Sequence, residues 1–170
     1  MYNQLQALQE CLYRDIPLTR HLKLSLNSYD AHCLEIRAPL TENSNHVGTA
    51  FAGSLNSVVT LAGWSMLWLV LKELGLDGEI VIQDSTCNYL EPVTKDFYAC
   101  CYKPDSEHIG QFEKVLKKKG KARLELQAEI VEDGVVRVSF KGRYVVQARK
   151  RVNPLVHASR LQTVLASSMG

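Results

Sequence analysis

Acidic side chains are missing from the most apolar part of the sequence. No Asp or Glu lies between Glu42 and Glu73, and residues 50–71 carry no charge of either sign. Such a run is long enough to cross a bilayer. However, its most apolar part, residues 61–71, is too short to span alone, and the whole run includes serines, an asparagine, a threonine and two glycines. We therefore expect a helix buried on nearly all sides in a soluble protein, with no membrane partner.

The spacing of the cysteines suits neither a metal site nor a disulfide framework. The count is odd and no C-x-x-C pair occurs, so no zinc site is expected. The cysteines are Cys11, Cys33, Cys87, Cys100 and Cys101. The N-terminal residues lack the apolar core of a secretory signal. These absences favour a cytoplasmic protein with reduced, mostly buried thiols and no bound metal.

A strong net charge is absent as well. The formal net charge is +2 and the pI about 8.3, which is too mild to favour a nucleic-acid partner. With 46% hydrophobic and 22% charged residues in 170, the chain has the composition of one soluble globular domain. We assign that domain to residues 1–148 and expect a basic tail, helical or disordered, over residues 149–170.

Hydrophobic periodicity predicts where the helices lie. Leucines spaced at i, i+3 and i+7 predict a short amphipathic helix over residues 3–14, which Pro17 ends. The long apolar helix follows a polar loop and runs to about Leu74, with Gly75 where a left-handed C-cap belongs. A loop and a further short helix are expected over residues 105–119.

Alternation of apolar and polar residues predicts the strands. Two strands precede the long helix, around residues 22–27 and 32–38. Residues 79–89 and 96–102 follow it, and two long strands close the domain. The order predicts an α+β fold in which an antiparallel sheet wraps around one long buried helix. Because that helix needs more cover than one small sheet gives, we expect a symmetric homodimer.

The last two strands allow their register to be predicted. A three-residue loop over residues 132–134 would set Ile130 opposite Val136 and Glu129 opposite Arg137. Apolar residues then face apolar ones, and opposite charges meet on the polar face. A two-residue loop would instead set Ile130 against Arg137, so we expect the longer loop with a left-handed glycine in a bulge.

Three segments resemble a known family. They are residues 48–55 (GTAFAGSL), 61–64 (LAGW) and 89–93 (YLEPV). Together they resemble the hotdog-fold thioesterases and acyl dehydratases, and most of all the bacterial thioesterases of the YiiD C-terminal-domain type. The resemblance covers about residues 5–148. It implies an acyl thioester substrate on coenzyme A or acyl carrier protein, interface sites in homodimers that sometimes pair into tetramers, and no metal or redox cofactor.

Thioester hydrolysis needs a polarised carbonyl group, which the start of the buried helix can provide. Its free N–H groups and positive dipole end stabilise developing negative charge. Gly53 allows a ligand to approach the backbone closely, so we expect the N–H groups of Gly53 and Ser54 to hold the carbonyl oxygen. The alternative interpretation is that these residues only form a tight turn and a helix cap.

The group that activates water is harder to find in the sequence. Many hotdog thioesterases of the H-G-G type place an Asp or Glu one to two turns into this helix, near Thr60, which is therefore the catalytic candidate at that position here. The remaining candidates are His46, since histidine titrates near neutrality, Asn45, which could orient a water, and Asp84 on a later strand. A backbone contact for His46 and an ion pair for Asp84 are the structural alternatives. The missing carboxylate argues against the hypothesis of an acyl dehydratase. It leaves a non-hydrolytic acyl-thioester-binding protein as a second hypothesis.

Substrate contacts are expected from the polar loop, the helix start and a basic segment. The candidate substrate-binding residues are Asn43, Asn56, Ser57, Lys121 and Arg123. The last two end a basic segment, residues 114–123, that could receive coenzyme A phosphates or an acidic carrier protein. A solvated helix end would explain the same charges. Trp64 and Trp68 are expected in the core rather than in an acyl pocket.

Overall fold

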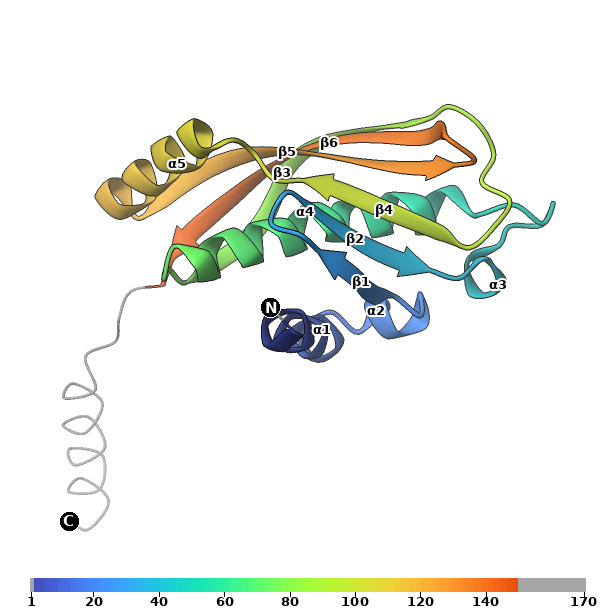
Figure 1. Cartoon of the computed structure of the whole chain (residues 1–170), viewed down its shortest axis with the longest axis horizontal. Helices are drawn as coiled ribbons and strands as arrows, with labels where there is room; N and C mark the ends of the chain where they lie inside the picture. The colour runs from blue at the N-terminus through green and yellow to red at the C-terminus, as the bar shows by residue number, and fades with distance from the viewer. Residues whose placement is uncertain (1, 150–170) are drawn as a thin grey trace, which may run out of the picture.

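The structure is a computed structural model that describes residues 2–149 (Figure 1). Its helices are α1 (Tyr2–Asp15), α2 (Leu18–His21), α3 (Leu40–Asn43), α4 (Ala52–Glu73) and α5 (Ser106–Lys119). Its strands are β1 (Ser25–Tyr29), β2 (Cys33–Ala38), β3 (Gly78–Tyr89), β4 (Phe97–Tyr102), β5 (Lys121–Glu132) and β6 (Val135–Ala148). The basic tail expected over residues 149–170 lies, except for Arg149, outside the described residues.

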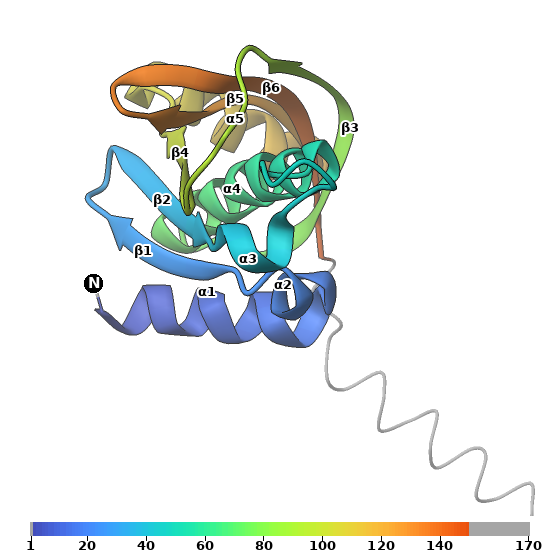
Figure 2. The ribbon, with the colours of Figure 1, turned by 90° about the vertical axis from the view of Figure 1, so that its right-hand side faces the viewer.

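One sheet organises the fold. Within residues 2–149, six strands pair antiparallel in the order β1-β2-β4-β5-β6-β3. Figure 2 shows the sheet curving around α4, with α1 alongside β1. The α+β class and the wrapping of the sheet around the long helix are therefore confirmed. Gly75 has the left-handed φ of +64° expected where α4 ends.

Helix α4 fills the centre because it is apolar on most of its circumference. It is long and apolar enough to span a membrane by length and composition, yet 67% of its most apolar window is buried inside the protein. That burial is typical of a core helix. One stripe is covered less well, since Ser57, Thr60, Trp64 and Trp68, spaced three or four apart, are only half-buried. The two tryptophans thus lie at the margin of the core rather than inside it.

The start of the sheet differs from the expectation. A strand was expected from Leu22, but β1 begins at Ser25, and Leu22 is the C-cap of α2. Lys23 is left-handed, with φ of 51°, which redirects the chain so that Leu22 and Leu24 are both buried without forming a strand. The alternating leucines thus correctly indicated that Leu22 and Leu24 are buried, but they wrongly indicated that these residues form a strand.

The β5–β6 hairpin corrects the predicted register. Its turn is only two residues long, Asp133–Gly134, with positive φ angles of 53° and 77° as a type I′ turn requires. A bulge between Ile130 and Val131 sets Ile130 opposite Val138, so every partner predicted for β5 shifts by two residues along β6. The bulge restores the alternation that a bare two-residue turn would break, and the apolar face therefore stays apolar.

Strand β3 is a long and exposed edge of the sheet. Among the described residues it pairs with β6 on one side only. Its apolar side chains include Val81, which is 59% exposed, and Ile82, which is 37% exposed. The half-buried stripe of α4 adjoins this strand, because the Trp64 Nε1 group donates a 3.2 Å hydrogen bond to the Ile80 carbonyl. Long apolar edges of this kind are sites of pairing with another chain.

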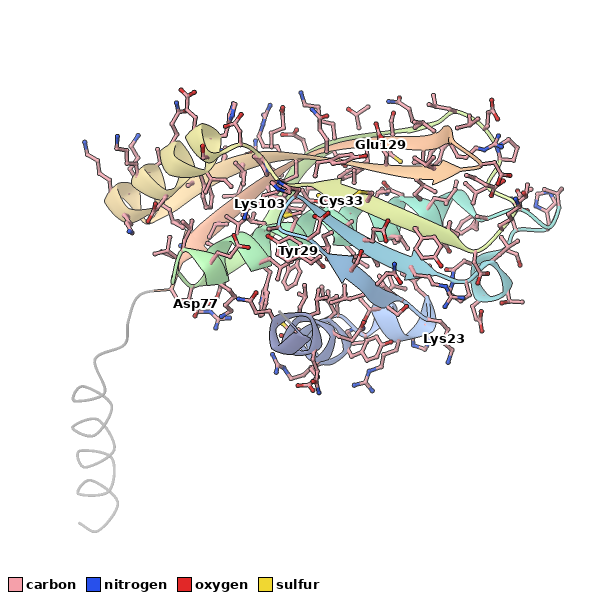
Figure 3. All side chains as sticks on the ribbon, in the orientation of Figure 1. Lys23, Tyr29, Cys33, Asp77, Lys103 and Glu129 are labelled. Carbon is pink, nitrogen blue, oxygen red and sulfur yellow. A yellow bond between two sulfur atoms is a disulfide. The ribbon has the colours of Figure 1, made fainter. Side chains whose placement is uncertain are left out.

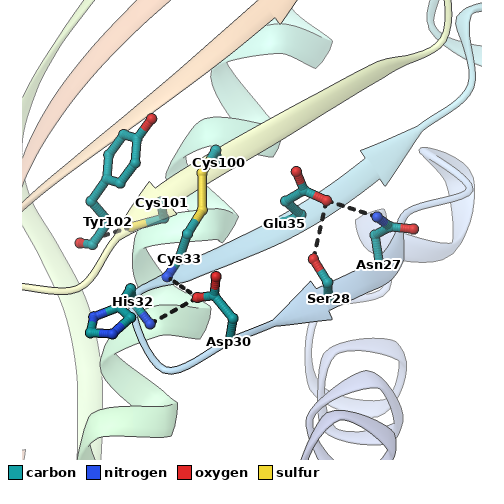
Figure 4. The surroundings of a disulfide bond; sticks show 9 residues. All are labelled: Asn27, Ser28, Asp30, His32, Cys33, Glu35, Cys100, Cys101 and Tyr102. Atoms are coloured by element: carbon teal, nitrogen blue, oxygen red, sulfur yellow. Dashed lines mark hydrogen bonds between the residues drawn. A yellow bond between two sulfur atoms is a disulfide. The ribbon is translucent and has the colours of Figure 1, made fainter.

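A disulfide joins β2 to β4, which corrects the expectation of reduced thiols. Cys33 pairs in register with Tyr102, so Cys100 is its diagonal neighbour, with the two Cα atoms 6.2 Å apart (Figure 4). The other cysteines, Cys11, Cys87 and Cys101, are free. Cys33 and Cys100 are 67 positions apart in the sequence, and the strand order that brings them together was not predicted from it.

The C-terminal end of α4 is tied to the sheet by a polar network. The Tyr29 hydroxyl donates a 2.6 Å hydrogen bond to Glu73, and Lys103 forms a 2.5 Å ion pair with the same carboxylate. Figure 3 labels Tyr29 and Lys103, which lie close together beside α4. A carboxylate here opposes the helix dipole, and the Lys103 ammonium group offsets that effect.

Candidate active site at the start of helix α4

The first turn of α4 presents unpaired backbone donors. Its N-cap, Phe51, has extended backbone angles and no side chain that accepts a hydrogen bond from the helix. The first backbone bond inside the helix runs from the Leu55 N–H to the Phe51 carbonyl, at 3.0 Å. Within the described chain, the N–H groups of residues 52–54 therefore have no acceptor. Together with the helix dipole they form a site suited to a partly negative oxygen.

Phe51 covers this turn and was not identified from the sequence. A Cβ atom added to Gly53 would collide with the Phe51 ring, which means that the ring lies directly against the glycine backbone. Phe51 is 54% exposed, so its side chain is not part of the buried core. The glycine thus provides the close approach that was expected, but in this structure an aromatic ring occupies that space. A phenylalanine two positions before a glycine was the only sequence signal.

Asn45 organises the preceding loop. Its side-chain oxygen accepts hydrogen bonds from the N–H groups of Val47 and Thr49, and its amide donates to the Thr49 hydroxyl at 2.8 Å. The Asn45 N–H also donates to the Thr49 carbonyl at 2.7 Å. These bonds engage the side chain in a tight turn. His46 lies at the exposed tip of that turn, with no hydrogen bond from its ring to the described part of the chain.

Asn43 is enclosed in the protein. Its side-chain amide donates to the carbonyls of Leu22 and Pro39, at 2.9 and 2.8 Å. Its backbone carbonyl accepts a 2.7 Å hydrogen bond from the Phe51 N–H. The side chain is 1% exposed, and both amide hydrogens are used. Asn43 therefore anchors the loop and has no donor left for a substrate. Its Oδ1 atom has no hydrogen-bond partner within residues 2–149.

The residues predicted on α4 fall into two groups: some make hydrogen bonds within the protein, and others are accessible near the start of the helix. The Ser57 hydroxyl donates to the Gly53 carbonyl at 2.8 Å, a local bond within α4. The Thr60 carbonyl accepts a 2.7 Å hydrogen bond from the Tyr144 hydroxyl. Ser54 and Asn56 are half-buried near the start of the helix. The structure thus brings Gly53, Ser54, Asn56 and Ser57 together, one turn before Thr60.

Asp84 lies on the face of the sheet that points away from α4. It is opposite Arg143 in the register and forms a 3.2 Å ion pair with it. The inward positions of this part of β3 are instead Cys87 and Tyr89, whose partners on β6 are buried. Within one chain, the structure does not bring Asp84 to the start of α4. Its catalytic role stays a prediction, and the ion-pair alternative is the arrangement observed.

Tyr89 is a site residue that the sequence did not single out as functional. Its hydroxyl donates a 3.3 Å hydrogen bond to the Ala52 carbonyl, which places the phenol beside the first turn of α4. The ring is 49% exposed. Burial raises the pKa of the neighbouring Cys87 thiol, and a hydrogen bond with Tyr89 offsets this only in part. Cys87 is therefore not an activated nucleophile.

Lys121 and Arg123 lie at the other end of the molecule from the start of α4. They begin β5, next to the C-terminal end of α5. The Arg123 Nε group donates to Gln83 at 2.8 Å. A substrate bound at Gly53 of the same chain would not reach them directly. As for metals, residues 2–149 contain no group of three or more His, Cys, Asp or Glu side chains that could hold an ion.

Comparison with known families decides the class of the protein. A family model described as "Putative thioesterase (yiiD_Cterm)" matches residues 5–148. The chain belongs to this family. The YiiD C-terminal family match therefore spans α1 through β6, including the start of α4 and the end of β3.

Solved structures agree with that assignment. A protein of unknown function from Chlorobaculum tepidum is 30% identical, with a TM-score of 0.83 over 85% of this chain and 94% of that one. A "putative thioesterase" from Shewanella oneidensis is 32% identical, with a TM-score of 0.79 over 86% of this chain and 99% of that one. A thioesterase from Haemophilus influenzae, at 14% identity and a TM-score of 0.62 over 88% and 94%, shares the fold. The chain is thus a thioester hydrolase with the hotdog fold.

Proposed function

We propose that this thioesterase hydrolyses acyl-CoA or acyl-carrier-protein thioesters in the cytoplasm, as a homodimer with its sites at the subunit interface. The observation that carries the proposal is the uncapped first turn of α4, where the N–H groups of residues 52–54 lack acceptors in the described chain. No side chain of the helix competes for these donors, and Gly53 leaves the backbone accessible once the Phe51 ring moves.

The first chemical role belongs to the backbone. The thioester carbonyl oxygen accepts hydrogen bonds from the Gly53 and Ser54 N–H groups, and the helix dipole adds to their effect. When water attacks the carbonyl carbon, the oxygen becomes an oxyanion, and these fixed donors bind it more strongly than they bind the ground state. The carbonyl then reforms as the C–S bond breaks, which releases the acyl group as a carboxylic acid and the thiolate of coenzyme A or of the carrier, and the thiolate takes up the proton removed from the water.

The second role is removal of a proton from the attacking water. We assign this role first to His46, because it lies at the solvent-exposed tip of the turn that leads into α4 and its ring makes no hydrogen bond to residues 2–149. The Tyr89 hydroxyl, beside Ala52, orients the water or the substrate. Asp84 is the second candidate for the base. Its outward position and its ion pair with Arg143 count against it.

The homodimer is supported by the exposed edge of β3 and the adjoining stripe of α4. Two copies would offer the same edge, and identical sheet edges pair antiparallel about a two-fold axis. Pairing would satisfy the open backbone groups of β3 and cover Val81, Ile82 and the half-buried tryptophans. Size-exclusion chromatography with light scattering should give twice the chain mass of 19.1 kDa, or four times that mass if dimers pair.

Steady-state hydrolysis of acyl-CoAs of graded chain length, and of the same acyl groups on carrier protein, tests the activity. We expect turnover by the wild type, a loss of about 100-fold in kcat for His46→Ala, and little change for Asp84→Asn. The reverse order of losses would transfer the base to Asp84. Binding without hydrolysis of any thioester would reject the enzymatic proposal in favour of a non-hydrolytic binding protein.

A further inference from the structure

Helix α5 and the start of β5 carry a basic surface that the hydrolytic site does not use. We call it the lysine cluster: Lys114, Lys117, Lys118, Lys119, Lys121 and Arg123. The helix is fixed on one side by Phe112 and Leu116, which are buried against the sheet. The Asp105 side chain caps its first turn, and the left-handed Gly120, with φ of +68°, ends its last one. The fold therefore holds these charges on a rigid, outward-facing element.

Most of these charges are not neutralised by the protein itself. Lys117 pairs with Glu113 at 2.6 Å, and Arg123 donates to the neutral Gln83. For Lys114, Lys118 and Lys119, no ion pair occurs within residues 2–149. The helix dipole favours lysines in the last turn. It does not account for the basic residues that continue into β5.

An apolar side chain lies among the lysines. Val115 is 38% exposed and lines a shallow hollow with Lys114, Lys117, Lys118 and Lys119. An apolar centre surrounded by charge is the pattern of a small protein–protein contact. Phosphate groups of a free nucleotide are more often held by arginine forks or by backbone N–H groups. Neither is present in this hollow, whose lining consists of Val115 and the four lysines.

The proposed dimer brings this surface to the active site. In one chain, Tyr89 at the end of β3 contacts the start of α4, whereas Gly78 at the other end pairs with Ala148. The Ala148 N–H donates to the Gly120 carbonyl, at the base of the lysine cluster. Antiparallel pairing of two β3 edges places the end of one β3 near the beginning of the other. The lysine cluster of one copy and the start of α4 in its partner then share one end of the dimer.

We infer that the lysine cluster docks the acidic surface of an acyl carrier protein, whose acyl thioester is then delivered to the α4 site of the partner subunit. This rests on the proposed function and names the carrier protein as the preferred source of substrate. The charges steer the acidic protein toward the enzyme, and Val115 contacts an apolar side chain at the centre of the docked surface.

The test compares two single charge reversals in the full-length protein. Lys118→Glu alters the cluster, and Lys23→Glu alters an exposed lysine far from α5 (Figure 3). Lys118→Arg is a further control, because it keeps the positive charge at residue 118. The substrates are one acyl group on carrier protein, on coenzyme A and on N-acetylcysteamine. We expect Lys118→Glu to lower kcat/KM for the carrier substrate about tenfold and to change the other two less than about twofold. Lys118→Arg and Lys23→Glu should behave as the wild type.

Two results would overturn the inference: an equal loss on coenzyme A, which would assign the cluster to phosphate binding, or full activity of Lys118→Glu on the carrier substrate. Direct binding of carrier protein bearing phosphopantetheine, measured by fluorescence anisotropy, separates this inference from the proposed function. If the wild type hydrolyses no thioester, the function fails. The docking surface is then still supported by a dissociation constant about tenfold higher for Lys118→Glu than for Lys23→Glu, and rejected by equal constants.

Discussion

The Tyr144 hydroxyl donates a 2.7 Å hydrogen bond to the Thr60 carbonyl, through a gap that exists because residue 63 is a glycine. A Cβ atom at Gly63 would collide with the phenol of Tyr144, whose side chain is completely buried. Strand β6 and helix α4 are thus locked together one to two turns after the candidate site. The position of the first turn of α4 depends on this contact.

Substitutions at two glycines test that contact. We expect Gly63→Ala to lower the free energy of unfolding by about 1–3 kcal/mol, because the added methyl group displaces Tyr144 from a close-packed core. Gly110 provides the matched control, since its position in α5 has no atom near an added Cβ. Gly110→Ala should raise the free energy of unfolding by up to about 1 kcal/mol. Urea unfolding measures both, and equal effects would contradict the assigned contact.

The Phe51 ring is expected to control access to the first turn of α4. Gly53→Ala should force the ring from its position and misplace the backbone donors, lowering kcat by about tenfold or more. Combining it with Phe51→Ala removes the collision, so the double variant should recover the part of the loss that comes from the displaced ring. Kinetics of the two single variants and the double variant measure this coupling. Additive losses would mean that the ring and the glycine act independently.

The edge of β3 is expected to hold the dimer together. Val81→Lys places a charge on this exposed strand and should shift the protein toward monomer, with activity falling in parallel because the proposed site needs both subunits. Val135→Lys is the control, because Val135 is also exposed, at 43%, but begins β6 at the hairpin turn. Light scattering and hydrolysis are measured on the same samples. A fully active monomer would disprove an interface site.

A buried carboxylate should make stability depend on acid pH. Glu132 accepts hydrogen bonds from the Thr94 N–H and hydroxyl, both at 2.8 Å, and from the Lys95 N–H at 3.1 Å. Burial acts to raise the pKa of Glu132, but these donors outweigh it, so the pKa is lowered. A lowered pKa contributes stability above the unfolded value of about 4.3, which is lost as pH falls through the folded value.

Glu132→Gln should therefore lower the urea midpoint of unfolding at neutral pH. The difference between the midpoints of the wild type and the variant should shrink as the pH falls to about 3. Urea midpoints measured for both proteins from neutral pH to acid test this expectation. A constant difference across that range would mean that Glu132 titrates alike in the folded and unfolded chains.

Features set by local sequence were predictable. The apolar run that became α4, the left-handed Gly75 and the inward faces of β5 and β6 follow from periodicity and from backbone preferences of neighbouring residues. The family resemblance added the α4 start as the candidate site. These signals are strong because each is carried by residues that are close together in the chain.

Features set by distant contacts were not predictable in the same way. Asn43 looked like a loop residue available to substrate, but Leu22 and Pro39 enclose it. The predicted three-residue loop and the observed two-residue turn with a bulge both keep apolar residues of β5 opposite apolar residues of β6. Alternation along the strands therefore could not decide between the two registers. The outward orientation of Asp84 depends on another bulge, between Ile82 and Asp84. A bulge reverses which side chains face the core without changing the composition of the strand.

The strand order has a consequence for synthesis of the protein. Gly78, at the start of β3, pairs with Ala148, the last residue of β6, so β3 leaves the ribosome long before its partner exists. During that interval the apolar surface of α4 also lacks the later strands β4–β6 that cover it. Strand β3 must therefore wait for its partner within the same chain until the domain is almost complete, and the nascent chain is most prone to aggregation just before β6 emerges.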